Sequence, residues 1–316
     1  MSSLEVGSQT LPVTTGTMPF RGHETWYRVT GTLDPGAPAD APAPLVVLHG
    51  GPGAAHDYTL AMTSLAEDGR AVVHYDQLGC GRSTHLPDVD PSFWTVELFV
   101  AELRALVEHL GIADRFHLLG QSWGGMLGPE VVLSDDGGIL SLSICDSPAS
   151  MPLWLQAANE LRAELPADVQ ATLLAHEEAG TTDSPAYKAA EEVFYDRHVC
   201  RVVPNPPEVA ATFAQLEAEP TVYHAMNGPS EFHVIGSLKE WSVVDRVGGI
   251  RVPTLVVAGA HDEAKPIVWQ PFLERIPDVR SHVFAESSHM PHVEEPAAFT
   301  AVVGAFLREH DRPAAS

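Results

Sequence analysis

The chain has 316 residues, of which 45% are hydrophobic and 19% charged, and its formal net charge is −24. A chain of this length can hold a core domain with an insertion, or two small domains. The acidic balance, 42 Asp and Glu against 18 Lys and Arg, argues against nucleic acid and anionic membranes as partners, because both attract basic patches. A small cationic substrate would suit this charge, and so would an ordinary acidic surface.

The sequence has few features that would indicate a disulfide framework, a targeting signal or a membrane span. The three cysteines, Cys80, Cys145 and Cys200, are too scattered for a disulfide framework or a C-x-x-C metal site, and we expect Cys145 to be a buried thiol. The N-terminus shows no basic segment followed by an apolar one. No run approaches the roughly 18 apolar residues that span a bilayer. We therefore expect a cytoplasmic protein without membrane segments, and the oligomeric state stays open.

The first half of the chain predicts a sheet. An antiparallel start is expected over residues 1–34, where residues 24–30 are rich in aromatic and β-branched side chains. A Pro- and Ala-rich linker at residues 35–44 should be loose, as should the tail at 312–316. Continuous apolar runs predict buried parallel strands at residues 45–48, 71–76, 115–119 and 138–145. Apolar residues at helical spacing predict an amphipathic helix over 95–110 that Gly111 ends.

The alternation of strands and helices stops after residue 148. Between residues 149 and 244 we find no clear buried strand, but four helical patterns, at 153–165, 169–178, 186–198 and 207–216. Strand patterns return at 254–259 and 281–284, and a closing helix is expected over 296–309. We therefore predict a core domain of residues 1–148 and 245–316, with a helical cap domain of residues 149–244 inserted into it.

The segment L-G-Q-S-W-G-G at residues 119–125 lies between a predicted strand and a predicted helix that continues past Pro129. Gly-x-Ser-x-Gly at a sharp strand–helix turn is the nucleophile elbow of the α/β-hydrolases. Side chains at Gly120 and Gly124 would collide with neighbouring backbone. Ser122 itself should have a strained backbone conformation. The sequence therefore predicts an α/β-hydrolase fold, with a mostly parallel central sheet, helices on both faces and Ser122 as nucleophile.

A serine nucleophile needs a base, and the base needs a carboxylate that orients it. In this fold the carboxylate follows the next-to-last strand and the histidine follows the last one, which selects Asp262 and His289. Asp146, which follows the strand after the elbow, is the alternative acid. His292 is the alternative base, although its place near the final helix indicates capping or packing.

The loop H-G-G-P-G at residues 49–53 follows a predicted central strand. Glycines there allow backbone N–H groups to point into the cleft. In this architecture one N–H of that loop and the N–H of the residue after the nucleophile form the oxyanion hole. We expect Gly51 and Trp123 to provide them, with Gly50 as the alternative to Gly51, and we expect His49 to be structural.

The reaction class follows from the nucleophile. A serine at the elbow implies an acyl ester intermediate, so the reaction should be hydrolysis of an ester, thioester or amide. This chemistry requires no metal and no organic cofactor. In the Gly-rich connection at residues 77–83, we expect Asp76 and Arg82 to form a structural ion pair without a catalytic role.

The sequence resembles the proline iminopeptidase family of α/β-hydrolases from about residue 25 to its end. The matching segments are H-G-G-P-G at 49–53, Y-D-Q-L-G-C-G-R-S at 75–83, G-Q-S-W-G-G-M at 120–126, F-Y-D-R-H-V-C-R at 194–201 and M-N-G-P-S-E-F at 226–232. Other hydrolases share the first three in part, and the two cap segments are more specific. Upstream of residue 187 the cap matches less clearly, which leaves the strictness for proline open.

The resemblance implies a serine aminopeptidase that removes an N-terminal residue, preferentially proline, from peptides. It also implies that Glu231 and Glu263 hold the free amino group of a small peptide or amino acid derivative, since carboxylates form charge-assisted hydrogen bonds with an ammonium. Candidates for lining the pocket of the first residue are Trp123, Phe232 and Trp241. The alternative is an amidase or esterase of the same fold, acting on amino acid amides or esters or on a secondary metabolite.

Overall fold

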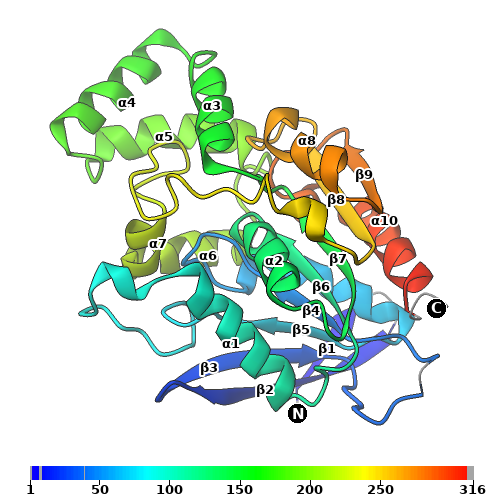
Figure 1. Ribbon diagram of the computed structural model, residues 1–316. Helices are drawn as coiled ribbons and strands as arrows, with labels where there is room; N and C mark the ends of the chain where they lie inside the picture. The colour runs from blue at the N-terminus through cyan, green and yellow to red at the C-terminus, as the bar shows by residue number, and fades with distance from the viewer. Residues whose placement is uncertain (1, 7–8, 39, 312–316) are drawn as a thin grey trace.

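The computed structural model describes residues 2–6, 9–38 and 40–311. Its centre is a sheet with the strand order β1-β2-β3-β5-β4-β6-β7-β8-β9 (Figure 1). The strands are β1 (Ser2–Val6), β2 (Gln9–Phe20), β3 (His23–Thr30), β4 (Leu45–Leu48), β5 (Val72–Tyr75), β6 (Phe116–Gln121), β7 (Ile139–Cys145), β8 (Thr254–Gly259) and β9 (Val279–Phe284). The pairs from β1 to β3 and from β3 to β5 are antiparallel, and the rest are parallel. The predicted antiparallel start and parallel strands are confirmed.

Helices cover both faces of the sheet, as predicted. On one face α1 (Val96–His109), α2 (Trp123–Ser134) and α8 (Pro266–Arg275) pack into one hydrophobic cluster with Val46 and Leu48 of β4. On the other face the 3-10 segment η1 (Asp57–Asp68) and α10 (Pro296–Glu309) form a second cluster with Leu45 and Val47. Successive strand residues point to opposite faces, so a strand covered on both sides must be apolar throughout.

Residues 149–244 contain α3 (Met151–Arg162), α4 (Ala167–Ala179), α5 (Pro185–His198), α6 (Pro207–Ala218) and α7 (Thr221–Met226). The four predicted helices are present, and α7 was not predicted. Figure 1 shows α3, α4 and α5 at one end of the molecule, beyond the sheet. A third hydrophobic cluster joins these helices to Tyr58 and Met290 of the flanking segments. The division into a core domain and a cap domain stays a prediction.

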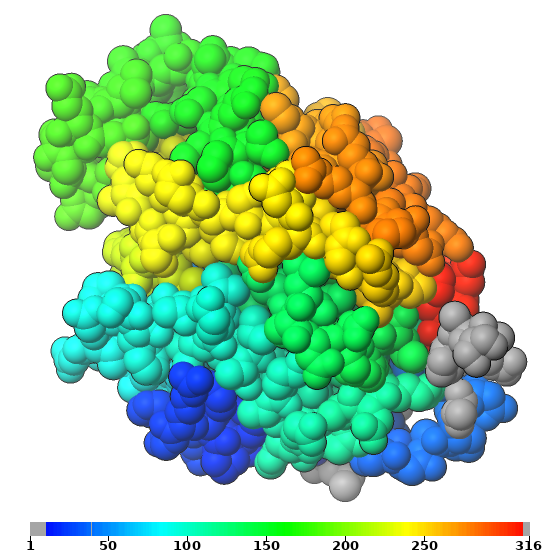
Figure 2. Space-filling model, viewed as in Figure 1, coloured from blue at the N-terminus to red at the C-terminus, as the bar shows by residue number. Residues whose placement is uncertain are grey.

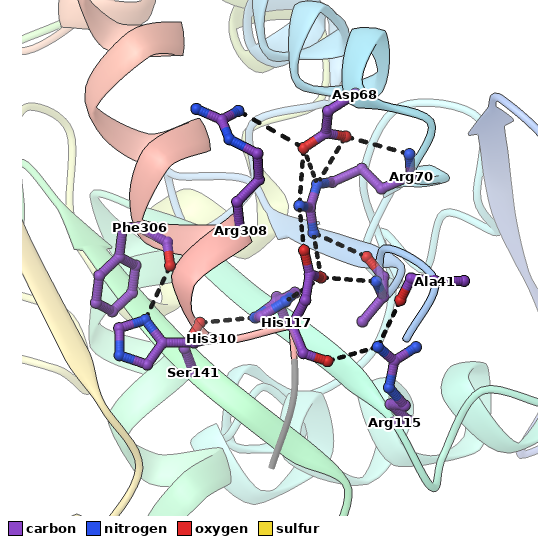
Figure 3. A network of polar contacts seen from close by, with 11 residues as sticks. Ala41, Asp68, Arg70, Arg115, His117, Ser141, Phe306, Arg308 and His310 are labelled. Carbon is purple, nitrogen blue, oxygen red and sulfur yellow. Dashed lines mark hydrogen bonds and ion pairs between the residues drawn. The ribbon is translucent and has the colours of Figure 1, made fainter. Parts of the chain in front are cut away.

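The linker at residues 35–44 is fixed at its far end, contrary to the prediction of a loose segment. The Ala43 N–H donates to Oδ1 of Asp311 over 2.8 Å. Arg70, which is 1% exposed, pairs with both Asp68 and Asp311. Figure 3 shows this network, in which His117 of β6 also contacts Asp311 at 3.1 Å. The network anchors the start of β4 to the end of α10; the tail at 312–316 lies outside the described residues.

The predicted ion pair between Asp76 and Arg82 is wrong. Asp76 accepts a hydrogen bond from the backbone N–H of Arg82 over 2.9 Å, while the guanidinium lies 4.7 Å from the ring centre of Trp26. The side chain of Asp76 pairs instead with His56 at 2.8 Å. Asp76 is fully buried, and backbone amides can satisfy a buried carboxylate without burying a guanidinium as well.

The remaining composition-based expectations concern cysteines and membranes. Cys80, Cys145 and Cys200 are free and buried, which confirms the buried thiol expected at Cys145. In the described part of the chain, every helix is too short or too polar to cross a membrane.

Candidate active site

Ser122 occupies the turn between β6 and α2. Its φ of 55° and ψ of −121° lie in a region that residues other than glycine rarely adopt. Its N–H donates to the Cys145 carbonyl over 2.9 Å, which fixes the turn to β7. A Cβ at Gly120 would collide with the Gly124 carbonyl, and one at Gly124 with the Leu48 carbonyl. The tight, strained elbow expected from the glycines is therefore present.

His289 and Asp262 follow β9 and β8, which are parallel neighbours, so the two side chains meet at one edge of the sheet. Nδ1 of His289 lies 2.7 Å from Oδ1 of Asp262. Burial alone would lower the pKa of His289, but the charge and hydrogen bond of Asp262, with smaller effects of Glu231 and Glu294, raise it above its ordinary value. With Nδ1 donating to Asp262, the neutral imidazole presents Nε2 as the basic nitrogen.

A small cavity of about 50 Å³ collects most of the predicted site. Five residues selected from the sequence line it: Gly51, Ser122, Glu231, Glu263 and His289. Asp262 lies behind His289 and is 4% exposed. Segments that are far apart in the chain therefore bring the candidate nucleophile, base, acid, loop donor and amine-binding carboxylates together.

The two alternative triad residues have other partners. Asp146 accepts the Gly259 N–H over 3.2 Å, and in residues 2–6, 9–38 and 40–311 it has no hydrogen bond to a histidine. Its burial, and next the charge of Asp262, raise its pKa well above the ordinary value. His292 contacts the Tyr58 carbonyl through Nε2 at 3.2 Å, and burial lowers its pKa to about 3. A neutral packing histidine fits the role expected for His292.

Gly51 of the loop at residues 49–53 lines the same cavity as Ser122. Gly51 has φ of 110°, and a Cβ there would lie 2.5 Å from the Gly53 nitrogen. The Gly50 N–H donates to the Tyr58 hydroxyl over 2.7 Å, which favours Gly51 over Gly50 as the oxyanion donor. Trp123 is the first residue of α2, where an N–H has no acceptor within the helix.

Gln77 joins the two halves of this candidate oxyanion hole. Its Oε1 accepts from the Trp123 indole N–H over 2.9 Å, and its Nε2 donates to the His49 carbonyl over 3.2 Å. Its own N–H donates to Nε2 of His49 over 3.0 Å. His49 therefore has the structural role that we expected. Gln77 was not singled out, because nothing in a Gly-rich loop indicates which side chain turns inward.

Glu231 and Glu263 approach the cavity from the segment after α7 and from the loop after β8. The Tyr223 hydroxyl donates to Oε1 of Glu231 over 2.6 Å. Glu263 is 1% exposed, and within the described chain neither of its carboxyl oxygens has a hydrogen-bond partner. Burial first, and then the charges of Glu231 and Asp262, raise its pKa well above the ordinary value. An ammonium bound here would supply the missing donors and offset the buried charge.

The three aromatic candidates for the pocket of the first residue lie at different places in the structure. Trp123 lines a second, narrow lobe beside Ser122. Phe232 is 2% exposed and packs under the Arg162 guanidinium of α3, and Trp241 donates its indole N–H to Glu130 over 2.9 Å. Neither Phe232 nor Trp241 lines the cavities beside Ser122.

Trp154 of α3 belongs to the narrow lobe and was missed. Its indole N–H donates to the Glu231 carbonyl over 2.7 Å, and its ring centre lies 5.8 Å from that of His289. Met151 lines the same lobe. In the sequence, Met151 and Trp154 look like the apolar face of an ordinary helix, so their place beside Ser122 could not be predicted. Among the described residues, no group of three or more metal-binding side chains is arranged to hold a metal ion.

Comparisons with known proteins identify the family of this chain. Residues 43–296 match the family model described as "alpha/beta hydrolase fold". The proline iminopeptidase of Lactobacillus helveticus is 36% identical over 300 residues, which cover 94% of this chain and 98% of the relative. The solved structure of proline iminopeptidase from Mycobacterium smegmatis shares 56% identity with a TM-score of 0.86, over 94% of this chain and 99% of the other.

The solved structure of VinJ is also similar, with 54% identity and a TM-score of 0.91 over 94% of this chain and 99% of that one. The similarity to each of these relatives covers 94% of this chain. The chain therefore belongs to the proline iminopeptidase family of α/β-hydrolases.

Proposed function

We propose that this protein is a serine aminopeptidase that releases the N-terminal residue, preferentially proline, from small peptides or amino acid derivatives. The observation that carries the proposal is that Glu231 and Glu263 line the same cavity as Ser122 and His289. Two buried carboxylates beside a nucleophile suit a substrate with a free ammonium, whereas a neutral acyl ester would leave both of them without a cation.

The reaction proceeds through an acyl-enzyme. His289, oriented by Asp262, takes the proton of Ser122 as the hydroxyl oxygen attacks the scissile carbonyl carbon. The N–H groups of Trp123 and Gly51 stabilise the oxyanion, each by roughly 3 kcal/mol. His289 protonates the leaving amine as the C–N bond breaks, which leaves the aminoacyl ester on Ser122. Water, deprotonated by His289, then hydrolyses that ester.

The two glutamates also account for cleavage at the first bond only. They hold the ammonium at a fixed distance from Ser122, so the carbonyl of the first residue is the one placed for attack. An internal peptide bond has no ammonium at that distance and would bury both carboxylates without a cation. The lobe beside Trp123, Met151 and Trp154 provides an apolar wall for the prolyl ring. The cytoplasm stays the expected compartment.

A substrate panel tests the proposal. Proline and alanine para-nitroanilides are compared with their N-acetylated forms and with para-nitrophenyl acetate. We expect the free-amine anilides, proline foremost, to exceed the acetylated ones in kcat/KM by about a hundredfold or more, because blocking removes a charge-assisted contact with each glutamate. Equal turnover of blocked anilides and simple esters would indicate an amidase or esterase of the same fold without an amine requirement.

A further inference from the structure

A larger cavity, of about 720 Å³, adjoins the small one at Ser122. The two share Val199, Phe213, Leu216 and Glu231 in their walls. The large cavity extends between α5, α6 and α7, and Figure 1 shows α5 beside α4 at the end of the molecule away from the sheet. Glu231 therefore faces the predicted amine site on one side and this cavity on the other.

The walls of the large cavity are strongly acidic. Its carboxylate side chains are those of Asp183, Glu191, Glu192, Asp196, Glu217 and Glu231. Lys188 is the sole lysine or arginine among its lining residues in the part of the chain that the structure describes. Such walls attract and concentrate positively charged groups.

Glu191 of α5 distinguishes this cavity from an ordinary acidic surface. It is 6% exposed, and its Oε1 has no hydrogen-bond partner within the described ranges. Its Oε2 contacts Nζ of Lys188 at 3.1 Å, but the Lys188 side chain is 46% exposed, and a half-exposed pair of this kind holds weakly. A buried carboxylate with an unused oxygen, in the wall of a cavity, needs a further cation or donor.

Aromatic rings complete a surface suited to a cation. Tyr195 of α5 and Tyr223 of α7 line the cavity, and the Tyr195 ring stacks on that of Phe213 at 6.0 Å between centres. Aromatic faces attract ammonium and guanidinium groups. Burial raises the pKa of Glu191 to about 7, and a bound cation would favour its charged form.

We propose that Glu191 and the acidic cavity form a second cation subsite, which selects substrates that carry an ammonium or guanidinium in addition to the N-terminal amine. The inference rests on the proposed function for the position of that first amine. The second charge can come from the side chain of the first residue or from the residue that follows it. In either case the substrate class is a dicationic peptide or amino acid derivative.

The test uses two pairs of substrates that differ by one charge. Lysine and norleucine para-nitroanilides place the charge on the first residue, and Pro-Lys-amide and Pro-norleucine-amide place it on the second. Each pair is assayed with the wild-type protein, with Glu191→Gln, and with Glu178→Gln as a control on an exposed glutamate of α4. The quantity compared is the ratio of kcat/KM between the charged and the neutral member.

We expect the wild-type protein to favour the charged member of at least one pair by about tenfold, the size of one charge-assisted hydrogen bond. Glu191→Gln should bring that ratio to about one, and Glu178→Gln should leave it as it is. A wild-type ratio near or below one in both pairs, or a preference that Glu191→Gln does not change, overturns the inference.

Binding separates this inference from the proposed function. Calorimetry with the Ser122→Ala variant compares lysine amide with norleucine amide, and Pro-Lys-amide with Pro-norleucine-amide, with and without the added Glu191→Gln change. If no free-amine substrate is hydrolysed, the proposed function fails, yet tighter binding of lysine amide that depends on Glu191 still supports the subsite. Equal binding of the charged and the neutral member in both pairs overturns the subsite whatever the hydrolysis assays give.

Discussion

Oε1 of Glu263 lies 3.9 Å from Nε2 of His289. The nitrogen that we assign to proton transfer with Ser122 is therefore close to the carboxyl that we assign to the substrate amine. An ammonium bound to Glu263 would neutralise that carboxyl and leave Nε2 available to Ser122. In the proposed mechanism, amine recognition and proton transfer are thus coupled through adjacent groups.

Glu263→Gln tests this relationship. We expect kcat/KM for proline para-nitroanilide to fall by about tenfold to a hundredfold, because a charge-assisted hydrogen bond to the amine is lost. The slow hydrolysis of the N-acetylated anilide should change much less. Glu286→Gln, on an exposed residue of the loop before His289, serves as the matched control. Equal losses on both substrates would contradict a role of Glu263 in reading the ammonium.

The pH profile tests the candidate base. His289 must be neutral to accept the Ser122 proton, and its raised pKa means that the neutral fraction decreases as the pH falls. We expect kcat/KM to decline on the acid side with a midpoint above the ordinary histidine value of 6.5. The raised pKa of Glu263 acts in the same direction, since its carboxylate also forms as the pH rises. A flat profile through this range would argue against both assignments.

Asp262→Asn should remove the orientation of His289 as well as the charge that raises its pKa. We expect kcat to fall by roughly 10⁴-fold while the fold is retained, as measured by turnover and by circular dichroism. Asp146→Asn provides the comparison, because Asp146 was the alternative acid. A larger loss of kcat in Asp146→Asn than in Asp262→Asn would reverse the assignment of the acid.

The close backbone contacts of the elbow glycines predict that substituting them lowers the stability of the fold. Gly124→Ala places a Cβ against the Leu48 carbonyl, where the backbone of β4 cannot yield, so we expect loss of folded protein or a fall of several degrees in Tm. Gly248→Ala is the control, since its Cβ would meet the Arg275 carbonyl oxygen at 3.6 Å, an ordinary contact. Thermal denaturation followed by circular dichroism compares the two. Similar Tm values for both variants would contradict the packing described for the elbow.

The network around Asp311 predicts acid sensitivity. Partial burial alone would raise the pKa of Asp311, but hydrogen bonds from His117, Ala43 and Arg70 lower it below its ordinary value. A lowered carboxyl pKa contributes stability above the unfolded-state value, and that stability is lost as the pH falls through the folded-state value. At neutral pH, Asp311→Asn should reduce the free energy of unfolding by about 2–3 kcal/mol, because the buried Arg70 loses a partner.

Urea denaturation at several pH values measures this effect. The difference between wild type and Asp311→Asn should shrink as the pH falls below the ordinary aspartate pKa of 3.8. Glu309→Gln breaks the exposed pair with Arg280 and should leave stability nearly unchanged. A constant difference at all pH values would mean that the ionised carboxylate of Asp311 is not the stabilising group.

The parts of the fold that the sequence predicted are those with strong local patterns. Strands buried on both faces are continuously apolar, so the bounds of β4 and β8 were predicted to the residue. The helix α8 was missed because Pro266 and Pro271 look like helix breakers, although α8 begins at the first and contains the second. The long strand β2 was not delimited, since Pro12, Gly16 and Pro19 interrupt its pattern.

The part of the candidate site that could be predicted is the part whose order along the chain is fixed by motifs. Ser122, Asp262 and His289 follow β6, β8 and β9, which is the chain order of nucleophile, acid and base in this fold, and that order selects them from the sequence. Burial is a tertiary property, so the unpartnered oxygens of Glu263 and Glu191 could not be foreseen. The ion pair between Asp76 and Arg82 was predicted wrongly for the same reason. Opposite charges close in sequence predict attraction, but the packing decides whether a backbone amide or a side chain meets the carboxylate.

The central claim is that Ser122 attacks the carbonyl of a residue with a free amino group. The most direct measurement is labelling with a fluorophosphonate, followed by peptide mass spectrometry and by turnover of proline para-nitroanilide. We predict one adduct, on the peptide that contains Ser122, with no labelling in Ser122→Ala and a loss of turnover of at least about 10³-fold at an unchanged Tm. An adduct on another residue, or near wild-type turnover by Ser122→Ala, would contradict the account.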